Sequence, residues 1–305
     1  MRKLLTRLRE RYEEIIPDLN LFLDYLLLPL KTTFRINTLK AEREEILSLI
    51  SDLNPIPLGW YRDGFITEKE GRIGNHLAHF LGYIYLQEAA SMIPVIVLSP
   101  QQDDRVLDMA AAPGSKTTQL AQFMDNHGLI VANDTSIKRI KALSGNIDRA
   151  GVINTVVTRM DGRRMGRLLP EYFDKILLDA PCSAEGTLRK SKEALYRWSE
   201  SSIKRLSSLQ KGLISSAFRC LKKGGVLVYS TCTFAPEENE EVIDFLLKRF
   251  EDAKLEEIEV KGLKTREGIE GWRGKEYREE VKRCVRIYPQ DNDTEGFFIA
   301  RVRKL

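Results

Sequence analysis

Two cysteines and an aspartate directly follow apolar runs of this sequence, at places where α/β proteins carry reactive side chains. Cys182 and Asp179 belong to the segment Asp-Ala-Pro-Cys-Ser, which follows an apolar run at 176–178. Cys232 comes shortly after a second apolar run, at 226–229. Both runs are typical of buried strands in a parallel sheet, and ligands bind beyond the carboxyl ends of such strands. Two thiols and a carboxylate at that edge favour covalent catalysis.

The other two cysteines do not extend this pattern. Cys220 falls on the apolar face of a predicted helix and Cys284 on a predicted strand, so both are interpreted as packing residues. Four cysteines are a poor disulfide framework for a chain of 305 residues. Because no C-x-x-C pair occurs, we expect no metal site.

Composition indicates a globular protein, with 43% hydrophobic and 30% charged residues. The net charge of +4 is too small to identify a nucleic-acid partner, although basic residues cluster at 2–11, 159–167 and 189–192. The N-terminus lacks a secretory signal, and the apolar stretch at 19–30 is too short to span a bilayer. We therefore expect a cytoplasmic protein without membrane association, acting as a monomer.

From residue 104 the sequence alternates between strand and helix patterns, which predicts an α/β fold with a doubly wound, mostly parallel sheet. Helices are predicted over 117–124, 136–150, 202–221 and 237–249. With two strands near the C-terminus, the sheet has seven predicted strands: 105–108, 129–132, 155–158, 175–178, 226–229, 282–288 and 296–302.

The first part of the chain has a different pattern. It contains helical periodicity over 4–28, a strand-like segment at 33–39 and another helical segment at 41–53. A helix over 85–98 is predicted to lead into the main domain. We divide the chain into a helical and small α+β module at 1–81 and a larger domain at 82–305.

A loop of small residues follows the first predicted strand of the larger domain. Small side chains let the backbone approach a ligand closely, and Gly114 permits a tight turn into the helix. The loop is neither G-x-G-x-x-G nor a P-loop, which disfavours dinucleotides and triphosphates. The candidate cofactor-binding residues of this loop are Ala110, Ala111, Ala112, Pro113, Gly114, Ser115 and Lys116.

Three successive strands of the larger domain end near an aspartate: Asp108, Asp134 and Asp161. One such aspartate commonly starts a turn or caps a helix. Three of them around a small-residue loop favour an adenosine-type cofactor without phosphates, which points to S-adenosylmethionine. Asp134 is placed to accept hydrogen bonds from a ribose and Asp161 from an adenine amino group. Arg139, on the following helix, and Asp179 are further cofactor-binding candidates.

Several motifs together resemble the Sun (Fmu/RsmB-like) family of RNA cytosine-5 methyltransferases, over nearly the whole chain. Ala110 stands where many members have Cys, and Ser115 where many have Gly. Neither position carries the chemistry. The matching segments are Arg35–Leu39, Gln87–Met92, Asp108–Thr117, Asp179–Ser183, Ser230–Cys232, Pro236–Asn239 and Gly296–Ala300.

The resemblance implies a Rossmann-like class I methyltransferase domain behind a small RNA-binding module. It also implies that Cys232 is the nucleophile and that Cys182 assists product release, whereas composition and spacing leave open which thiol attacks. Addition of a thiolate to carbon-6 of cytosine makes carbon-5 nucleophilic toward the methyl group. Asp179 can stabilise charge on the ring as the adduct forms, and Lys116 can orient Asp179 or the nucleophile.

The sequence does not name the substrate. A short chain without an added RNA-binding domain favours tRNA, with ribosomal RNA as the second candidate. Two further hypotheses are less favoured. A DNA cytosine-5 methyltransferase that uses Cys182 would leave Cys232 unexplained, and both thiols, Asp179 and the full cofactor loop argue against a non-catalytic RNA-binding assembly factor. We expect RNA phosphates to contact basic residues of the first module, namely those at 2–11 together with Arg35 and Lys40.

Overall fold

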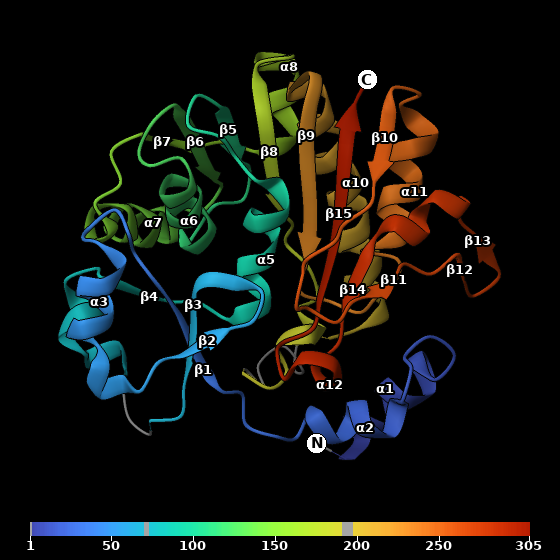
Figure 1. Ribbon diagram of the computed structural model, residues 1–305. Helices are drawn as coiled ribbons and strands as arrows, with labels where there is room; N and C mark the ends of the chain where they lie inside the picture. Colours follow the sequence, from blue (N-terminus) through green and yellow to red (C-terminus); the bar gives the residue numbers. More distant parts are fainter. Residues whose placement is uncertain (1, 70–72, 191–197) are drawn as a thin grey trace.

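The computed structural model describes residues 2–69, 73–190 and 198–305, and a large mixed sheet forms its centre (Figure 1). Within the described residues this sheet has nine strands, with the order β11-β14-β15-β9-β8-β5-β6-β7 and β10 paired to β15. The bounds are β5 Arg105–Asp108, β6 Leu129–Asp134, β7 Thr155–Arg159, β8 Phe173–Asp179, β9 Leu221–Thr231, β10 Ala253–Glu256, β11 Arg266–Glu267, β14 Val285–Ile287 and β15 Phe297–Lys304.

The central strands of the sheet are parallel and those at one edge are antiparallel. β5 pairs in parallel with β6 and β8, while β7 and β9 continue the parallel part outward. β15 runs antiparallel to β9. β14 and β10 both pair antiparallel with β15, and β11 pairs antiparallel with β14. All seven predicted strands are present, and the doubly wound, mostly parallel sheet is confirmed. The number seven was too low, because the short edge strands β10 and β11 also join.

Helices cover both faces of this sheet, because successive side chains of each buried strand point to opposite faces. Leu177 packs in one apolar cluster with α5, α6 and α7, whereas Ile176 and Leu178 pack in another with α10 and α11. These helices are α5 Ala89–Leu98, α6 Ser115–Phe123, α7 Ile137–Ala150, α10 Glu200–Cys220 and α11 Glu240–Arg249.

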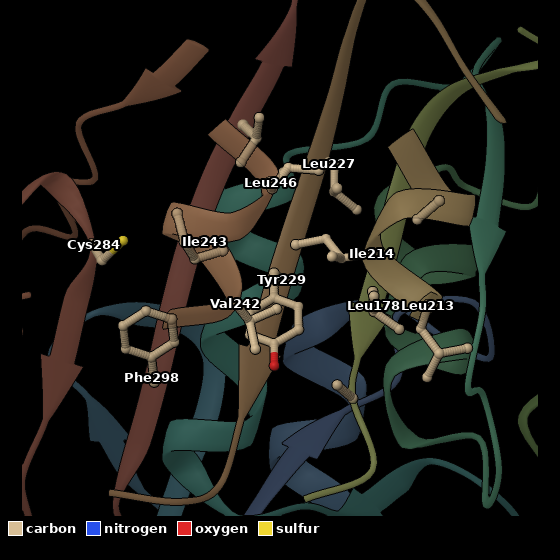
Figure 2. Close-up of a cluster of buried hydrophobic side chains, with 14 of the residues drawn as sticks. Leu178, Leu213, Ile214, Leu227, Tyr229, Val242, Ile243, Leu246, Cys284 and Phe298 are labelled. Atoms are coloured by element: carbon tan, nitrogen blue, oxygen red, sulfur yellow. The ribbon is translucent and has the colours of Figure 1, made fainter. Parts of the chain in front are cut away.

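Figure 2 shows the second of these clusters, where side chains of β8, β9 and β15 meet those of α10 and α11. Cys284 lies at its margin and Cys220 is also buried in this cluster, as predicted for packing residues. The labelled strand residues are Leu178, Leu227, Tyr229 and Phe298, and the labelled helix residues are Leu213, Ile214, Val242, Ile243 and Leu246.

The first part of the chain contains a separate antiparallel sheet with the order β2-β3-β1-β4. Its own small core includes Phe34, Ile46 and Phe65. The bounds are β1 Thr32–Ile36, β2 Ile56–Leu58, β3 Tyr61–Thr67, β4 Ile84–Leu86, α3 Arg43–Leu49 and α4 Leu77–Phe80, with 3-10 turns η1 Ser51–Leu53 and η2 Ile73–Asn75.

The helix predicted over 85–98 begins four residues later than expected. Tyr85 and Leu86 belong to β4, where they pair with Arg35 and Phe34 of β1. Helix α5 starts at Ala89. The side chain of Glu88, directly before it, caps the helix by accepting a hydrogen bond from the backbone of Ser91 at 3.1 Å. The strand pairing therefore outweighs the helical pattern at the start of this segment. The division of the chain at residue 81 stays a prediction.

Helices α1 (Arg2–Tyr12) and α2 (Leu19–Tyr25) lie apart from the small sheet, beside α12 (Pro289–Asn292) (Figure 1). Leu8, Tyr12 and Phe22 are buried in the apolar cluster of the large sheet. The N-terminal helices are thus packed on the large domain. The remaining elements are α8 Met165–Leu168, β12 Gly271–Trp272, β13 Lys275–Glu276 and the 3-10 turns η3 Gly162–Arg164, η4 Glu185–Thr187 and η5 Glu279–Arg283. None of the helices described is long and apolar enough to cross a bilayer.

Candidate active site

The two thiols predicted to do chemistry lie next to each other. Strands β8 and β9 run in parallel and end together, with Asp179 paired in register with Ser230. The chain after each strand end carries one cysteine, and the Sγ atoms of Cys182 and Cys232 are 3.3 Å apart. Both cysteines are partly exposed. A substrate at this edge of the sheet can therefore meet both thiols.

Asp179 is held by two donors beside the thiols. Ser230 Oγ donates to its Oδ1 at 2.7 Å, and Lys116 Nζ donates to its Oδ2 at 2.7 Å. Lys116 comes from the first turn of α6 and also donates to Ser91 Oγ at 2.8 Å. The structure thus brings together four predicted catalytic residues from three segments of the chain: Cys182, Cys232, Asp179 and Lys116.

The electrostatics of this group favour a charged Lys116 and a protonated Cys182. Burial lowers the pKa of Lys116, but the interactions with Asp179, Cys232 and Asp108 together outweigh burial, and the pKa lies above its ordinary value. Cys232 also favours the charged ammonium. The hydrogen bond to Cys232, together with burial, raises the pKa of Cys182 well above its ordinary value. At neutral pH Cys182 is therefore a thiol that can donate a hydrogen bond.

The small-residue loop joins β5 to α6 as predicted. Gly114 has a φ of 106°, and a Cβ atom there would lie 2.9 Å from Leu143 Cδ1, so glycine is required. The backbone of Ala111 donates to the carbonyl of Asn133 at 2.8 Å, which ties the loop to β6. Asp108 is buried under the loop, where burial raises its pKa to about 7.

Asp134 has a buried oxygen that suits a ribose hydroxyl. Its Oδ1 accepts a hydrogen bond from the backbone of Ser136 at 2.9 Å. Its Oδ2 is buried without a hydrogen bond, although Arg139 Nη1 lies 3.2 Å away. Arg139 also donates to the carbonyl of Ala112, so it connects Asp134 to the small-residue loop. Oδ2 is therefore ion-paired but makes no hydrogen bond, and a ribose hydroxyl could donate one to it.

Asp161 follows β7 and is already paired. Its carboxylate accepts hydrogen bonds from the backbone of Arg163 at 3.0 Å and from the Arg163 guanidinium. The side chain is about one third exposed. A further hydrogen-bond donor can therefore reach the Asp161 carboxylate, which already accepts more hydrogen bonds than Asp134 does.

Sequence reasoning assigned no site role to a group of buried carboxyl groups around the thiols, although the matching segment Pro236–Asn239 contains one of them. Glu185 is 1% exposed and accepts hydrogen bonds from Tyr12 Oη at 2.7 Å and from Thr233 Oγ1 at 2.9 Å. Glu238 and Glu295 are also buried close to the two thiol-bearing loops. Their partners lie far away in the sequence. No local pattern reports such contacts.

The structure also corrects two predicted RNA contacts. Arg35 is fully buried, donates to Gln87 at 3.0 Å and Gln122 at 2.6 Å, and lies over the ring of Tyr85. Arg11 is 5% exposed and forms ion pairs with glutamates of the large domain. Neither guanidinium can reach a phosphate, because both are used to join parts of the protein. Arg7, Arg9 and Lys40 are exposed, and the side chains of residues 2–4 lie outside the described residues.

Comparison with known proteins identifies a methyltransferase of Rossmann-like architecture. Residues 95–303 match the family described as 16S rRNA methyltransferase RsmB/F. Residues 4–89 match the N-terminal domain of 16S rRNA methyltransferase RsmF. The chain belongs to the RsmB/RsmF methyltransferase family, which confirms the resemblance to Sun proteins, and it is an enzyme of that class.

Two curated relatives differ in size and in the substrate that they are named for. The chain is 47% identical to the tRNA (cytosine(49)-C(5))-methyltransferase of Pyrococcus abyssi, over 99% of this chain and 97% of that protein. It is 42% identical to the ribosomal RNA small subunit methyltransferase F of Erwinia tasmaniensis, over 97% of this chain. The match covers 62% of the Erwinia protein, so that relative is considerably longer.

Two solved structures share the fold along their whole length. A methyltransferase homologue from Pyrococcus horikoshii superposes with a TM-score of 0.85 at 36% identity, covering 99% of both chains. NSun6 from Pyrococcus horikoshii, solved with SFG, gives a TM-score of 0.82 at 27% identity. This match covers 99% of this chain and 97% of NSun6.

Proposed function

We propose that this enzyme transfers a methyl group from S-adenosylmethionine to carbon-5 of a cytosine in tRNA, through a covalent cysteine adduct at carbon-6. The observation that carries this proposal is the pair of thiols 3.3 Å apart beside the Lys116–Asp179 ion pair. Two thiols within reach of one ring suit a reaction that first forms and then breaks a carbon–sulfur bond.

In this mechanism Cys232 attacks carbon-6 as a thiolate. The buried ammonium of Lys116 stabilises negative charge near that sulfur, and the Cys182 thiol can donate a hydrogen bond to it. Asp179, fixed by Ser230 and Lys116, accepts a hydrogen bond from the exocyclic amine of the cytosine. These contacts stabilise the charge that develops on the ring as the carbon–sulfur bond forms.

The second half of the reaction releases the product. The proton on carbon-5 passes to a water molecule, and the electron pair of the broken carbon–hydrogen bond restores the carbon-5–carbon-6 double bond. The carbon–sulfur bond breaks, and its electron pair leaves on the Cys232 sulfur. As a protonated thiol with its Sγ next to the departing sulfur, Cys182 is placed to act as the acid that donates a proton to that sulfur. We infer that Cys182 supports this elimination and that Cys232 is the nucleophile.

The cofactor-binding part of the proposal rests on the β5–α6 loop and the aspartates beyond it. S-adenosylmethionine supplies the methyl group when it is bound. The buried Asp134 oxygen that makes no hydrogen bond suits a ribose hydroxyl, and the partly exposed Asp161 suits an adenine amino group. The related NSun6 structure contains SFG, an analogue of S-adenosylmethionine, which supports this choice of cofactor.

A tRNA substrate is favoured by the relative from Pyrococcus abyssi, which matches over nearly the full length of both proteins. Ribosomal RNA is the second candidate, because the family description and the longer bacterial relatives carry that name. We propose a cytoplasmic monomer that acts on tRNA.

One experiment tests the substrate and the position of methylation. The purified protein is incubated with S-adenosylmethionine and either a tRNA transcript or fragments of 16S rRNA, and each RNA is mapped by bisulfite sequencing. We expect a protected cytosine in tRNA. Protection in the 16S fragments alone would favour the second candidate. Methyl transfer at another base or atom would contradict the proposal.

A further inference from the structure

The segment Pro236–Asn239 between β9 and α11 has no role in the mechanism above. It contains two polar side chains, Glu238 and Asn239, that are fully buried. Buried carboxylates and amides are stable in a protein interior when hydrogen bonds satisfy them. The partners of these two side chains are therefore informative.

Asn239 contacts the chain on both sides of Cys232. Thr231 Oγ1 donates to Asn239 Oδ1 at 2.6 Å, and Asn239 Nδ2 donates to the carbonyl of Thr233 at 2.9 Å. Asn239, Thr231 and Thr233 are each at most 1% exposed. One amide thus fixes the residues before and after Cys232.

Glu238 contacts the chain next to Cys182 in a similar way. Its Oε2 accepts hydrogen bonds from the backbone of Ser183 at 3.0 Å and from Gln210 Nε2 at 2.8 Å. The same Gln210 nitrogen donates to the carbonyl of Pro181 at 2.8 Å. Together Glu238 and Gln210 fix the residues before and after Cys182.

The two sets of contacts are joined to each other. The hydroxyl groups of Ser183 and Thr233 are 2.7 Å apart, directly between the two cysteine loops. Glu238 and Asn239 are also adjacent in sequence, so neither loop can shift without moving the other. We propose that Glu238 and Asn239 are positioning residues that set the distance between the Cys182 and Cys232 sulfurs.

This arrangement matters because the two thiols serve one ring. In the proposed function one sulfur bonds carbon-6 while the other assists release, and misplacement by about 1 Å can cost a hundredfold in rate. Glu238 also has a second oxygen, Oε1, that is buried without a partner, and burial raises the pKa of Glu238 to about 7.

The distance between the sulfurs can be tested without RNA or methyl transfer. Phenylarsine oxide bridges two close thiols, forming two As–S bonds while its oxygen leaves as water with both thiol protons. We expect the wild-type protein to bind it tightly through Cys182 and Cys232, as located by peptide mass mapping. Asn239→Ala should bind it roughly tenfold more weakly, because both contacts around Cys232 are lost. In Asn239→Ala, iodoacetamide should still alkylate Cys182 and Cys232, because this reagent reacts with one thiol at a time.

Asn37→Ala is the matched control. Asn37 is also a buried amide, and its Nδ2 donates to the carbonyls of Gly82 and Ala150 at 2.9 and 2.8 Å, away from the thiols. We expect its arsenical affinity to stay within about twofold of the wild-type value. An equal loss in Asn37→Ala would mean that general destabilisation explains the effect, and would overturn the inference.

Thr231→Val provides a milder test if Asn239→Ala does not fold, since it removes one hydroxyl from the same set. It should weaken arsenical binding several-fold. Folded Asn239→Ala or Thr231→Val protein with wild-type affinity would overturn the inference. The catalytic role of the thiol pair rests on the proposed function, but arsenical binding depends only on the positions of the two thiols. A failed methylation assay would therefore leave this result unaffected.

Discussion

The loops at the ends of β5 and β6 differ from those at the ends of β8 and β9 in how their polar groups are paired. On the β5–β6 side, Asp134 has a buried oxygen without a hydrogen bond, and the Arg139 side chain beside it is half exposed. On the β8–β9 side, Glu185 and Asn239 accept or donate several internal hydrogen bonds each. Buried oxygens without a hydrogen bond also occur on the second side, at Glu238 and Glu295. The difference is that internal hydrogen bonds hold both thiol loops of the second side in place, whereas an exposed arginine is the side-chain partner of Asp134 on the first.

This difference matches what each side has to do. A cofactor must enter and leave, so its site keeps polar groups available. Reacting sulfurs must be held in place before the substrate arrives, so their loops are fixed by buried bonds. Changes on the β8–β9 side should therefore affect chemistry and stability, and changes on the β5–β6 side should affect cofactor affinity.

The largest effect is expected from the two thiols. Cys232→Ala should lose activity by at least about a thousandfold and form no covalent RNA complex, because no carbon-6 adduct is possible. Cys182→Ala should accumulate a protein–RNA adduct, because attack proceeds while elimination stalls. A denaturing gel of each variant with RNA and S-adenosylmethionine measures this. The reverse pattern would identify Cys182 as the nucleophile.

A large change in pH dependence is expected at Glu295, which is 4% exposed and precedes a glycine bonded to Gly186 in the Cys182 loop. Burial, and after it the charge of Glu88, raises the pKa of Glu295 to about 8. The folded protein then keeps a proton that the unfolded chain loses above about pH 4.5, so the free energy of unfolding falls as pH rises from about 4.5 to 8. Glu295→Gln should remove on the order of 3 kcal/mol of this fall.

Urea denaturation at pH 5 and pH 8 measures the effect of Glu295→Gln. A residual slope should remain, because burial raises the pKa values of Asp108 and Glu238 to about 7. If the variant and the wild-type protein lost the same free energy between these pH values, Glu295 would be ionised in the folded state. The incomplete pairing of its Oε1 atom would then need another explanation.

A moderate effect on cofactor affinity is expected on the β5–β6 side. Asp134→Ala should weaken S-adenosylmethionine binding by roughly 1–3 kcal/mol, the range for losing a hydrogen-bonded charged partner. Asp161→Ala should weaken S-adenosylmethionine binding by less, because Asp161 is already paired with Arg163. Calorimetry measures both, with the exposed Asp148 of α7 changed to Ala as a control. Unchanged affinity in both variants would refute this placement of the cofactor.

The smallest effect is expected from exposed arginines of α1. Replacing Arg7 and Arg9 by Gln should weaken tRNA binding a few-fold. The slope of log binding constant against log salt concentration should become shallower, as expected for the loss of up to about two phosphate contacts. Filter binding over a range of salt concentrations measures this. The control replaces the exposed Lys248 and Arg249 in the last turn of α11, the helix whose first turn follows the Cys232 loop. Equal losses in both pairs would indicate a nonspecific effect of net charge.

The parallel part of the fold was predictable because its strands are short, continuous apolar runs. Observed β5 and β7 match the predicted ranges to within one residue. Strands β10 to β13, between Ala253 and Glu276, were not predicted, since they are very short and all except β12 contain charged residues. Their pairing depends on neighbouring strands and not on their own sequences. The same holds for β4, whose residues pair with β1.

The candidate site was predictable where its residues follow strand ends and match motifs, as for Cys182, Cys232 and Asp179. The supporting contacts were not predictable. Tyr12 and Glu185 are 173 positions apart, and no local pattern connects them. Charge also misled the prediction at Arg35 and Arg11, because a basic residue in a sequence is expected to be exposed, whereas these two are buried with partners from other segments.

The buried Arg35 has a consequence for engineering. Its guanidinium enters a socket formed by Gln87, Gln122 and Thr118, and the last two belong to α6, the helix that also carries Lys116. A chimera that grafts the small sheet of a relative onto this catalytic domain would have to carry matching socket residues across the junction. Without a match, an arginine of the small sheet would be buried without partners, or the amide oxygens of the catalytic domain would lack a donor.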